Sequence, residues 1–91
     1  MALTWPTKDE DEVLDYVLDW SNRLASGDTI TTSTWIVEAG IDKDSDSKTD
    51  STTTIWLSGG TDGVTYTLTN RVVTAGGRTM DQSVDLPVAT K

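Results

Sequence analysis

The sequence predicts an all-β domain built from two stacked sheets. Threonine is abundant and phenylalanine is absent, a bias toward the β-branched residues that suit half-buried pleated surfaces. Short runs with apolar residues at alternate positions recur along the chain, and glycine-rich or polar turn signals separate them. No long helix is indicated, so we expect about five to seven antiparallel strands around one thin core. A small open barrel is the second possibility.

Residues 1–12 form the first predicted element, an extended N-terminal arm, and residues 13–91 form the folded domain. Pro6 pushes Trp5 toward an extended backbone, and an acidic run follows. Such an arm either frays in solvent or grips a neighbouring molecule, and both interpretations stay open. An aromatic residue in a polar tail supports the contact with a neighbouring molecule, because it has little reason to stay exposed. The partner-binding residues predicted in the arm are Trp5, Asp9, Glu10 and Asp11.

Two strands follow the arm. Residues 13–20 fit both a helical and an alternating period, and we assign a strand because alternation gathers the apolar side chains on one face. Residues 21–26 predict one helical turn, and Gly27 closes it because glycine accepts a positive φ. Residues 30–37 predict the second strand. Trp20 and Trp35 lie on the apolar faces of these strands, and we expect both in the core.

Residues 42–50 contain no apolar side chain, a composition that predicts an exposed loop. Four of its carboxylates occupy positions 1, 3, 5 and 9 of a calcium-loop pattern: Asp42, Asp44, Asp46 and Asp50. The pattern then fails, because the sixth position is Ser47 instead of glycine and the twelfth is Thr53 instead of glutamate. We therefore expect a solvated acidic loop and keep calcium binding as the weaker alternative.

The C-terminal half predicts a third strand and a β-hairpin. Over residues 52–58 the two faces compete for the core, since Ile55 and Leu57 share one face and Trp56 lies on the other. Trp56 fits less well inside, so it joins the predicted partner-binding residues. Beyond the glycine-dense corner, residues 64–74 and 78–88 alternate around a tight turn as the two arms of a hairpin, with Asn70 interrupting the apolar face.

Composition excludes several classes of function. The chain has no cysteine and no histidine, so it lacks a thiolate nucleophile, the commonest metal ligand and the commonest general base. Asp15 and Asp19 are better explained as the solvated side of a strand than as a carboxylate pair for catalysis. We expect no enzyme activity, no cofactor and no metal. The net charge of −8 opposes binding to nucleic acid or anionic membranes, and no apolar run approaches a membrane span.

Three segments of the C-terminal half resemble the last strands of bacterial and phage immunoglobulin-like domains: residues 57–63 (LSGGTDG), 66–70 (YTLTN) and 76–79 (GGRT). Tyr66, three residues after Gly63, resembles a tyrosine corner, in which the hydroxyl ties the strand to the loop before it. The resemblance implies an immunoglobulin-like β-sandwich.

Most of the chain is also similar to a group of short proteins of tailed bacteriophages and prophages, typically encoded among head and connector genes. The similarity includes residues 11–16 (DEVLDY), 19–20 (DW), 27–30 (GDTI) and 33–35 (STW). It implies a virion structural protein that is made in the host cytoplasm and binds the major capsid protein or another virion protein. The first expectation is a capsid-decorating or cement protein on the capsid surface.

Two alternatives to capsid decoration stay open. One is a head–tail connector or tail-associated adaptor, and the other is a carbohydrate- or receptor-binding module that stacks its ligand on an exposed tryptophan. Decorating subunits sit on symmetry axes, so a homo-oligomer on the particle is expected, with a trimer favoured.

Overall fold

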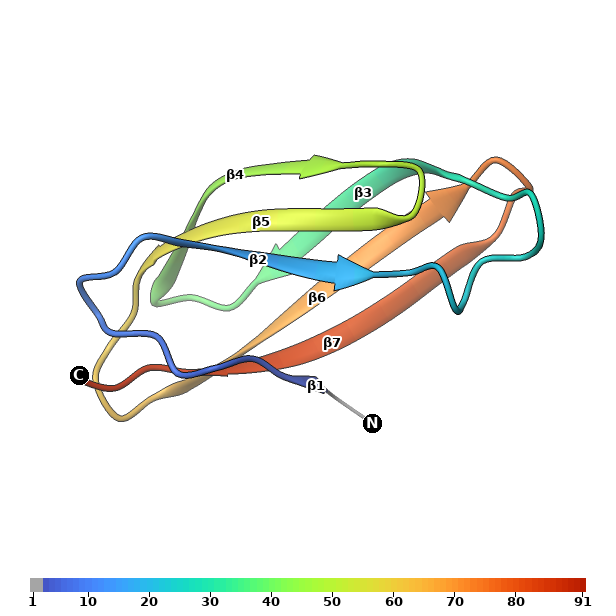
Figure 1. Ribbon diagram of the computed structural model, residues 1–91. Coiled ribbons are helices and arrows are strands. Elements are labelled where there is room, and N and C mark those ends of the chain that lie inside the picture. The colour runs from blue at the N-terminus through green and yellow to red at the C-terminus, as the bar shows by residue number, and fades with distance from the viewer. Residues whose placement is uncertain (1–2) are drawn as a thin grey trace.

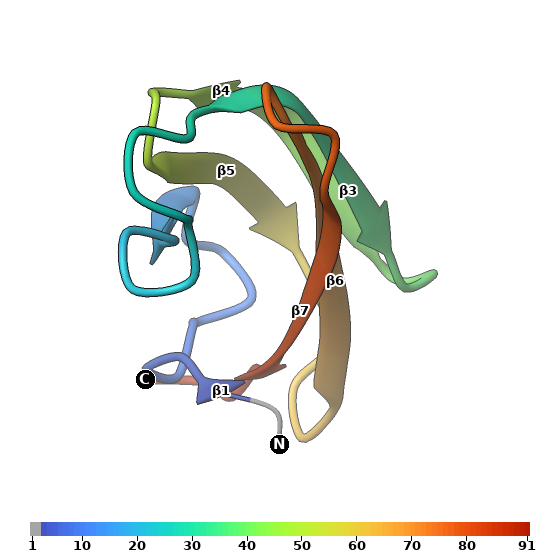
Figure 2. The ribbon, with the colours of Figure 1, turned by 90° about the vertical axis from the view of Figure 1, so that its right-hand side faces the viewer.

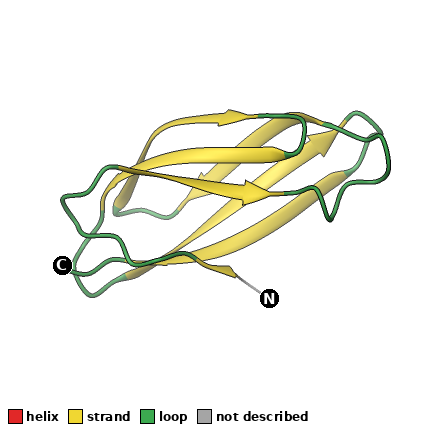
Figure 3. Ribbon diagram, in the orientation of Figure 1, coloured by secondary structure: helices red, strands yellow, loops and turns green. Residues whose placement is uncertain are grey.

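The computed structural model describes residues 3–91, so Met1 and Ala2 of the predicted arm lie outside it. The described chain has seven strands and no helix, hence none that could span a membrane (Figures 1 and 3). One sheet has the order β1 (Leu3–Thr4), β7 (Thr79–Pro87), β6 (Thr65–Thr74) and β3 (Ile30–Val37). The other has the order β2 (Leu14–Asp19), β5 (Thr52–Gly59) and β4 (Ile41–Lys48). The predicted all-β fold with two sheets is confirmed.

The two sheets pack face to face, and their strands pair antiparallel except for β1, which runs parallel to β7. The orders β2-β5-β4 and β7-β6-β3 are those of strands B-E-D and G-F-C in an immunoglobulin sandwich. The likeness to that fold stays a prediction, whereas the open barrel is not observed. The hairpin of β6 and β7 is confirmed over nine paired positions.

Alternate side chains of the long strands meet between the sheets and form the core. In β2, Tyr16 and Leu18 are buried while Asp15 and Val17 are exposed, which confirms the choice of strand over helix for this segment. Trp20 and Trp35 are 1% and 7% exposed, so their predicted place in the core is confirmed. The other buried apolar residues are Ile30, Ile41, Ile55, Leu57, Tyr66, Leu68, Val72, Val84, Leu86 and Val88.

Strand β4 lies where the sequence predicts an exposed loop, and that prediction is wrong. Residues 41–48 pair with β5 along their whole length, with one register shift between Lys43 and Ser45. β4 is an edge strand, and edge strands tolerate and even require charged side chains and bulges because these block pairing with other molecules. Ile41 is its one anchor in the core. The polar composition therefore marks an edge and not a loop.

Asn70 fastens the two sheets together in the middle of the core. Its Oδ1 accepts hydrogen bonds from Trp20 Nε1 (3.1 Å) and Thr53 Oγ1 (2.7 Å), which belong to the three-stranded side. Its Nδ2 donates to Ser33 Oγ and Thr34 O on β3, both at 3.0 Å. A fully paired polar network of this kind rigidifies the core and fixes how the sheets sit on each other.

Tyr66 forms the predicted tyrosine corner, and this prediction is confirmed. Its hydroxyl accepts a hydrogen bond of 2.9 Å from the backbone N–H of Thr61, in the loop directly before β6. Its ring packs so closely on Gly40 that a Cβ there would lie 3.0 Å from the ring. The loops at this end of the sandwich are therefore held by one buried side chain.

The N-terminal arm packs on its own domain. Figure 2 shows β3 and β4 adjacent on one side of the sandwich, while the arm crosses from β1 to β2 on the opposite side. Lys8 anchors it: its backbone pairs with Pro87 and Ala89, and its buried side chain donates from Nζ to Gly59 O at 2.7 Å. The arm thus packs along the open side of the sandwich instead of fraying from it, and its contact with a neighbouring molecule stays a prediction.

Candidate protein-binding surface

The outer side of the three-stranded sheet carries a cluster of exposed apolar side chains. Trp56 on β5 is 42% exposed and Val17 on β2 is 52% exposed. Trp56 lies opposite Asp15, and Val17 lies opposite Thr54, so Trp56 and Val17 are diagonal neighbours on adjacent strands. Val13, 54% exposed, precedes β2 at a position of the same parity. We call this outer side of the β2-β5-β4 sheet the Trp56 face.

Carboxylates surround the apolar cluster of the Trp56 face. Asp15 and Asp19 lie on β2, and β4 adds Asp42 and Asp44, the second accepting a hydrogen bond of 2.8 Å from Ser58 Oγ. The backbone N–H and hydroxyl of Ser21 stabilise the Asp19 carboxylate and lower its pKa below the usual 3.8. This rim is negatively charged at neutral pH.

The lysines of β4 do not neutralise this rim. Lys43 is paired in register with Leu57, and Lys48 with Thr53, so both project toward the inner side of the strand. Lys43 Nζ lies 2.9 Å from Asp46, on the same inner side. The Trp56 face is therefore apolar at its centre and acidic at its edge.

The outer side of the four-stranded sheet differs in chemistry. Its one large exposed apolar residue on the long strands is Ile36, 50% exposed. The polar side chains around it form hydrogen bonds and ion pairs with one another. One of these is the bidentate ion pair in which Arg71 Nε donates to Asp81 Oδ1 at 2.9 Å and Arg71 Nη2 donates to Asp81 Oδ2 at 3.1 Å. Such a surface gains less than the Trp56 face from being covered, because its polar groups already have partners.

Trp5, a predicted partner-binding residue, is half-buried against the core. Its ring stacks on Tyr16 with centroids 4.6 Å apart, and it lies 6.0 Å from Trp35. These contacts account for the tryptophan in the arm without a second molecule. Beside it, the Tyr16 hydroxyl and Trp35 Nε1 are buried with no hydrogen-bond partner among the described residues. Burial, aided by the nearby charge of Glu12, raises the pKa of Tyr16 to about 12.

The predicted acidic residues of the arm hold the C-terminal end of the chain. Asp9 accepts a hydrogen bond of 2.8 Å from the backbone N–H of Lys91, and this bond lowers the pKa of the carboxyl. Glu10 accepts from the hydroxyl of Thr90 at 3.0 Å. One carboxylate oxygen from each of Asp9, Glu10 and Asp11 lies within 4.8 Å of the other two. Two of the three carboxylates therefore have intramolecular partners.

The four carboxylates of the calcium-loop pattern do not converge. Three of them lie along the extended strand β4, where Asp44 accepts from Ser58 and Asp46 pairs with Lys43. Asp42 projects with the outer side, and Asp50 follows the strand. A calcium loop needs a tight turn that folds its ligands around one point, and a strand cannot provide it.

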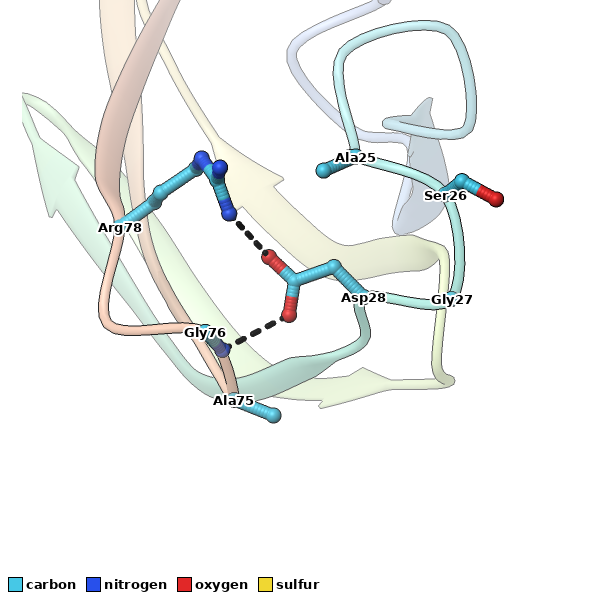
Figure 4. A pocket seen from close by; sticks show the side chains of 7 residues that line it. All are labelled: Ala25, Ser26, Gly27, Asp28, Ala75, Gly76 and Arg78. Atoms are coloured by element: carbon cyan, nitrogen blue, oxygen red, sulfur yellow. Dashed lines mark hydrogen bonds and ion pairs between the residues drawn. The ribbon is translucent and has the colours of Figure 1, made fainter.

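A shallow hollow at one end of the sandwich was not predicted from the sequence (Figure 4). Asp28 lies in it and accepts from the N–H of Gly76 at 2.8 Å, while Arg78 approaches the other oxygen at 3.3 Å. The Thr74 hydroxyl and the Gly76 N–H lower the pKa of this carboxyl. Asp28 thereby ties the loop before β3 to the β6–β7 turn. The sequence predicts only a chain reversal at Gly27-Asp28 and not this tie.

The comparison with known families places the chain among phage structural proteins. The family model described as "Podophage GP4 fiber-tail adaptor protein gp77" matches residues 8–87, which include every strand except β1. The chain belongs to this family. No curated protein matches it. The predicted resemblance to small structural proteins of tailed phages is confirmed. A phage structural protein of this kind is a component of the virion. Its description favours the tail-associated alternative over capsid decoration.

Proposed function

We propose that this protein is an adaptor that joins a tail fibre to the tail of a podophage particle through protein–protein contacts, without catalysis. The family match over residues 8–87 carries the proposal, because it includes strands β2 to β7 and with them the Trp56 face. Capsid decoration, our first expectation from the sequence, has less support because the family description names the fibre and the tail.

The architecture suits a rigid connector. The Asn70 network ties the two sheets together, the tyrosine corner fixes the loops at one end, and Lys8 locks the arm across the open side. The outer faces of the two sheets point in opposite directions and differ in chemistry, one apolar and acidic, the other rich in hydroxyl groups. An adaptor needs two such distinct surfaces to hold two different partners.

The absence of histidine and cysteine from the sequence supports a binding role. The hollow around Asp28 supports it too, since the single carboxylate there is held by Gly76 and Arg78 and offers no second acid or base. We also retain the prediction that the protein works as a homo-oligomer, with a trimer favoured, which native mass spectrometry of the purified chain would measure.

Particles assembled without this protein test the proposal. We expect them to have normal heads and to lack tail fibres, and we expect the purified chain to restore fibre attachment when it is added back. Fibre content would be measured by quantitative mass spectrometry and infectivity by plaque assay. Particles that keep their fibres but have heads sensitive to heat would contradict the adaptor function and favour capsid decoration. Loss of binding to host glycans by fibre-bearing particles would instead favour the receptor-binding alternative.

A further inference from the structure

We propose that the Trp56 face is the docking surface for a partner protein whose contact area combines an apolar centre with a rim of lysine and arginine. The inference rests on the proposed function in taking this partner from the tail or the fibre. It goes further by assigning the surface and the chemistry of what covers it.

The register of β2 and β5 brings the apolar side chains of the Trp56 face together. Strand pairing places Trp56 and Val17 on the same side of adjacent strands, and Val13 extends the cluster beyond the start of β2. In a chain with no phenylalanine, whose other tryptophans lie in the core or pack against it, a tryptophan exposed on the outer side of a sheet is an exception. Tryptophan is enriched among the residues that dominate the energy of protein interfaces.

The charges around the Trp56 face determine the sign of the charge on the partner. Asp15, Asp19, Asp42 and Asp44 rim the cluster, and the two lysines of β4, Lys43 and Lys48, project to the other side of that strand. Opposite charges across an interface steer association and fix orientation, so a basic rim complements this face.

A second copy of the chain does not suit this face. Two copies meeting face to face would use the same patch on both sides, and their aspartate rims would oppose each other. Like charges placed together at an interface oppose association. Pairing along the edge of β4 is also disfavoured, since that strand carries a bulge and alternating charges.

Binding measurements with purified chain and particles that lack it provide the first test. Trp56→Ala should weaken binding by about tenfold or more, the usual effect of removing an interface tryptophan. The double variant Asp15→Asn with Asp44→Asn should weaken it less and should flatten its dependence on salt between 50 and 300 mM, ranges in which screening changes strongly. Val64→Ala, which removes a similarly exposed apolar residue from the loop before β6, outside both sheet faces, is the matched control and should change binding by less than about twofold.

Photo-crosslinking in assembled virions identifies the partner. With benzoyl-phenylalanine in place of Trp56, we expect a cross-link to a tail or fibre peptide that lies among lysines and arginines; the same group at Ile36 should not reach that peptide. The urea midpoints of all variants, which must match that of the parent protein, exclude misfolding as the cause of weaker binding.

The outcomes separate this inference from the proposed function. Full binding by Trp56→Ala, no cross-link from position 56, or a cross-link to a second copy of the chain would overturn the docking surface even if fibres attach normally. A cross-link from position 56 to a capsid protein would keep the docking surface and overturn the adaptor function.

Discussion

Removing one hydroxyl from each of the two tyrosines should shift stability in opposite directions. Both rings are buried, with 4% of Tyr66 and 8% of Tyr16 exposed. The Tyr66 hydroxyl has a partner, the N–H of Thr61 at 2.9 Å, and the Tyr16 hydroxyl has none among the described residues. The substitutions Tyr66→Phe and Tyr16→Phe delete the same atom from these two environments, so each serves as the control for the other.

The expected magnitudes follow from the hydrogen bonds. A typical bond contributes about 0.5–1.5 kcal/mol net, and the N–H of Thr61 would lose its partner as well, so Tyr66→Phe should cost about 1–2 kcal/mol. Tyr16→Phe removes a polar atom that is buried without compensation, and it should be neutral or stabilise by up to about 1 kcal/mol. The two variants should therefore differ by about 2 kcal/mol.

Urea unfolding followed by tryptophan fluorescence measures this difference. With a slope of about 1 kcal/mol per molar urea for a domain of this size, the two midpoints should lie about 1–2 M apart. Equal midpoints, or a Tyr16→Phe variant that loses more than about 1 kcal/mol, would refute the assignment of one paired and one unpaired hydroxyl.

Three further predictions concern the ties within the fold. Asn70→Ala removes four hydrogen bonds, two to the three-stranded side and two to β3, and should cost about 3–4 kcal/mol in urea unfolding, against almost nothing for Thr65→Ala on the exposed side of the same strand; a loss below about 1 kcal/mol would contradict the role of the network. Lys8→Met leaves Gly59 O without its ammonium donor and should free the arm, which hydrogen–deuterium exchange would report as faster exchange of the Trp5 N–H, now bonded to Asp85 O; unchanged protection would show that Lys8 is not the anchor. The pKa of Asp28 is lower in the folded state than its ordinary 3.8, so the stability that the ionised carboxylate contributes is complete above that value and is lost as the pH falls through the folded-state pKa. Asp28→Asn should therefore flatten the acid limb of a plot of unfolding free energy against pH. An unchanged acid limb would count against the tie between Asp28 and the β6–β7 turn.

The strands that bury one face could be predicted from the sequence because burial imposes alternation. Residues 13–20 and 64–74 show this pattern, and the resemblance to immunoglobulin-like domains implies the tyrosine corner at Tyr66. β4 could not be predicted in this way, since an edge strand with only Ile41 in the core carries almost no apolar period. Its charges, which protect an edge, look like those of a loop.

The sequence predicts the apolar centre of the Trp56 face but not its acidic rim. Trp56 stood out because it could not share the core with Ile55 and Leu57, and the structure places it outside. Asp42 and Asp44 were assigned to a loop, so their place beside Trp56 depended on strand pairing that no local pattern specifies. The docking of the arm was equally hidden, because the burial of Lys8 depends on carbonyl groups brought together only by the fold.

Cryo-electron microscopy of the intact particle tests the central claim most directly. We predict density for this sandwich at the junction of tail and fibre, with the Trp56 face against a basic surface of one of those proteins. A sandwich bound to the capsid shell, or one at the junction whose Trp56 side is bare to solvent, would contradict the account.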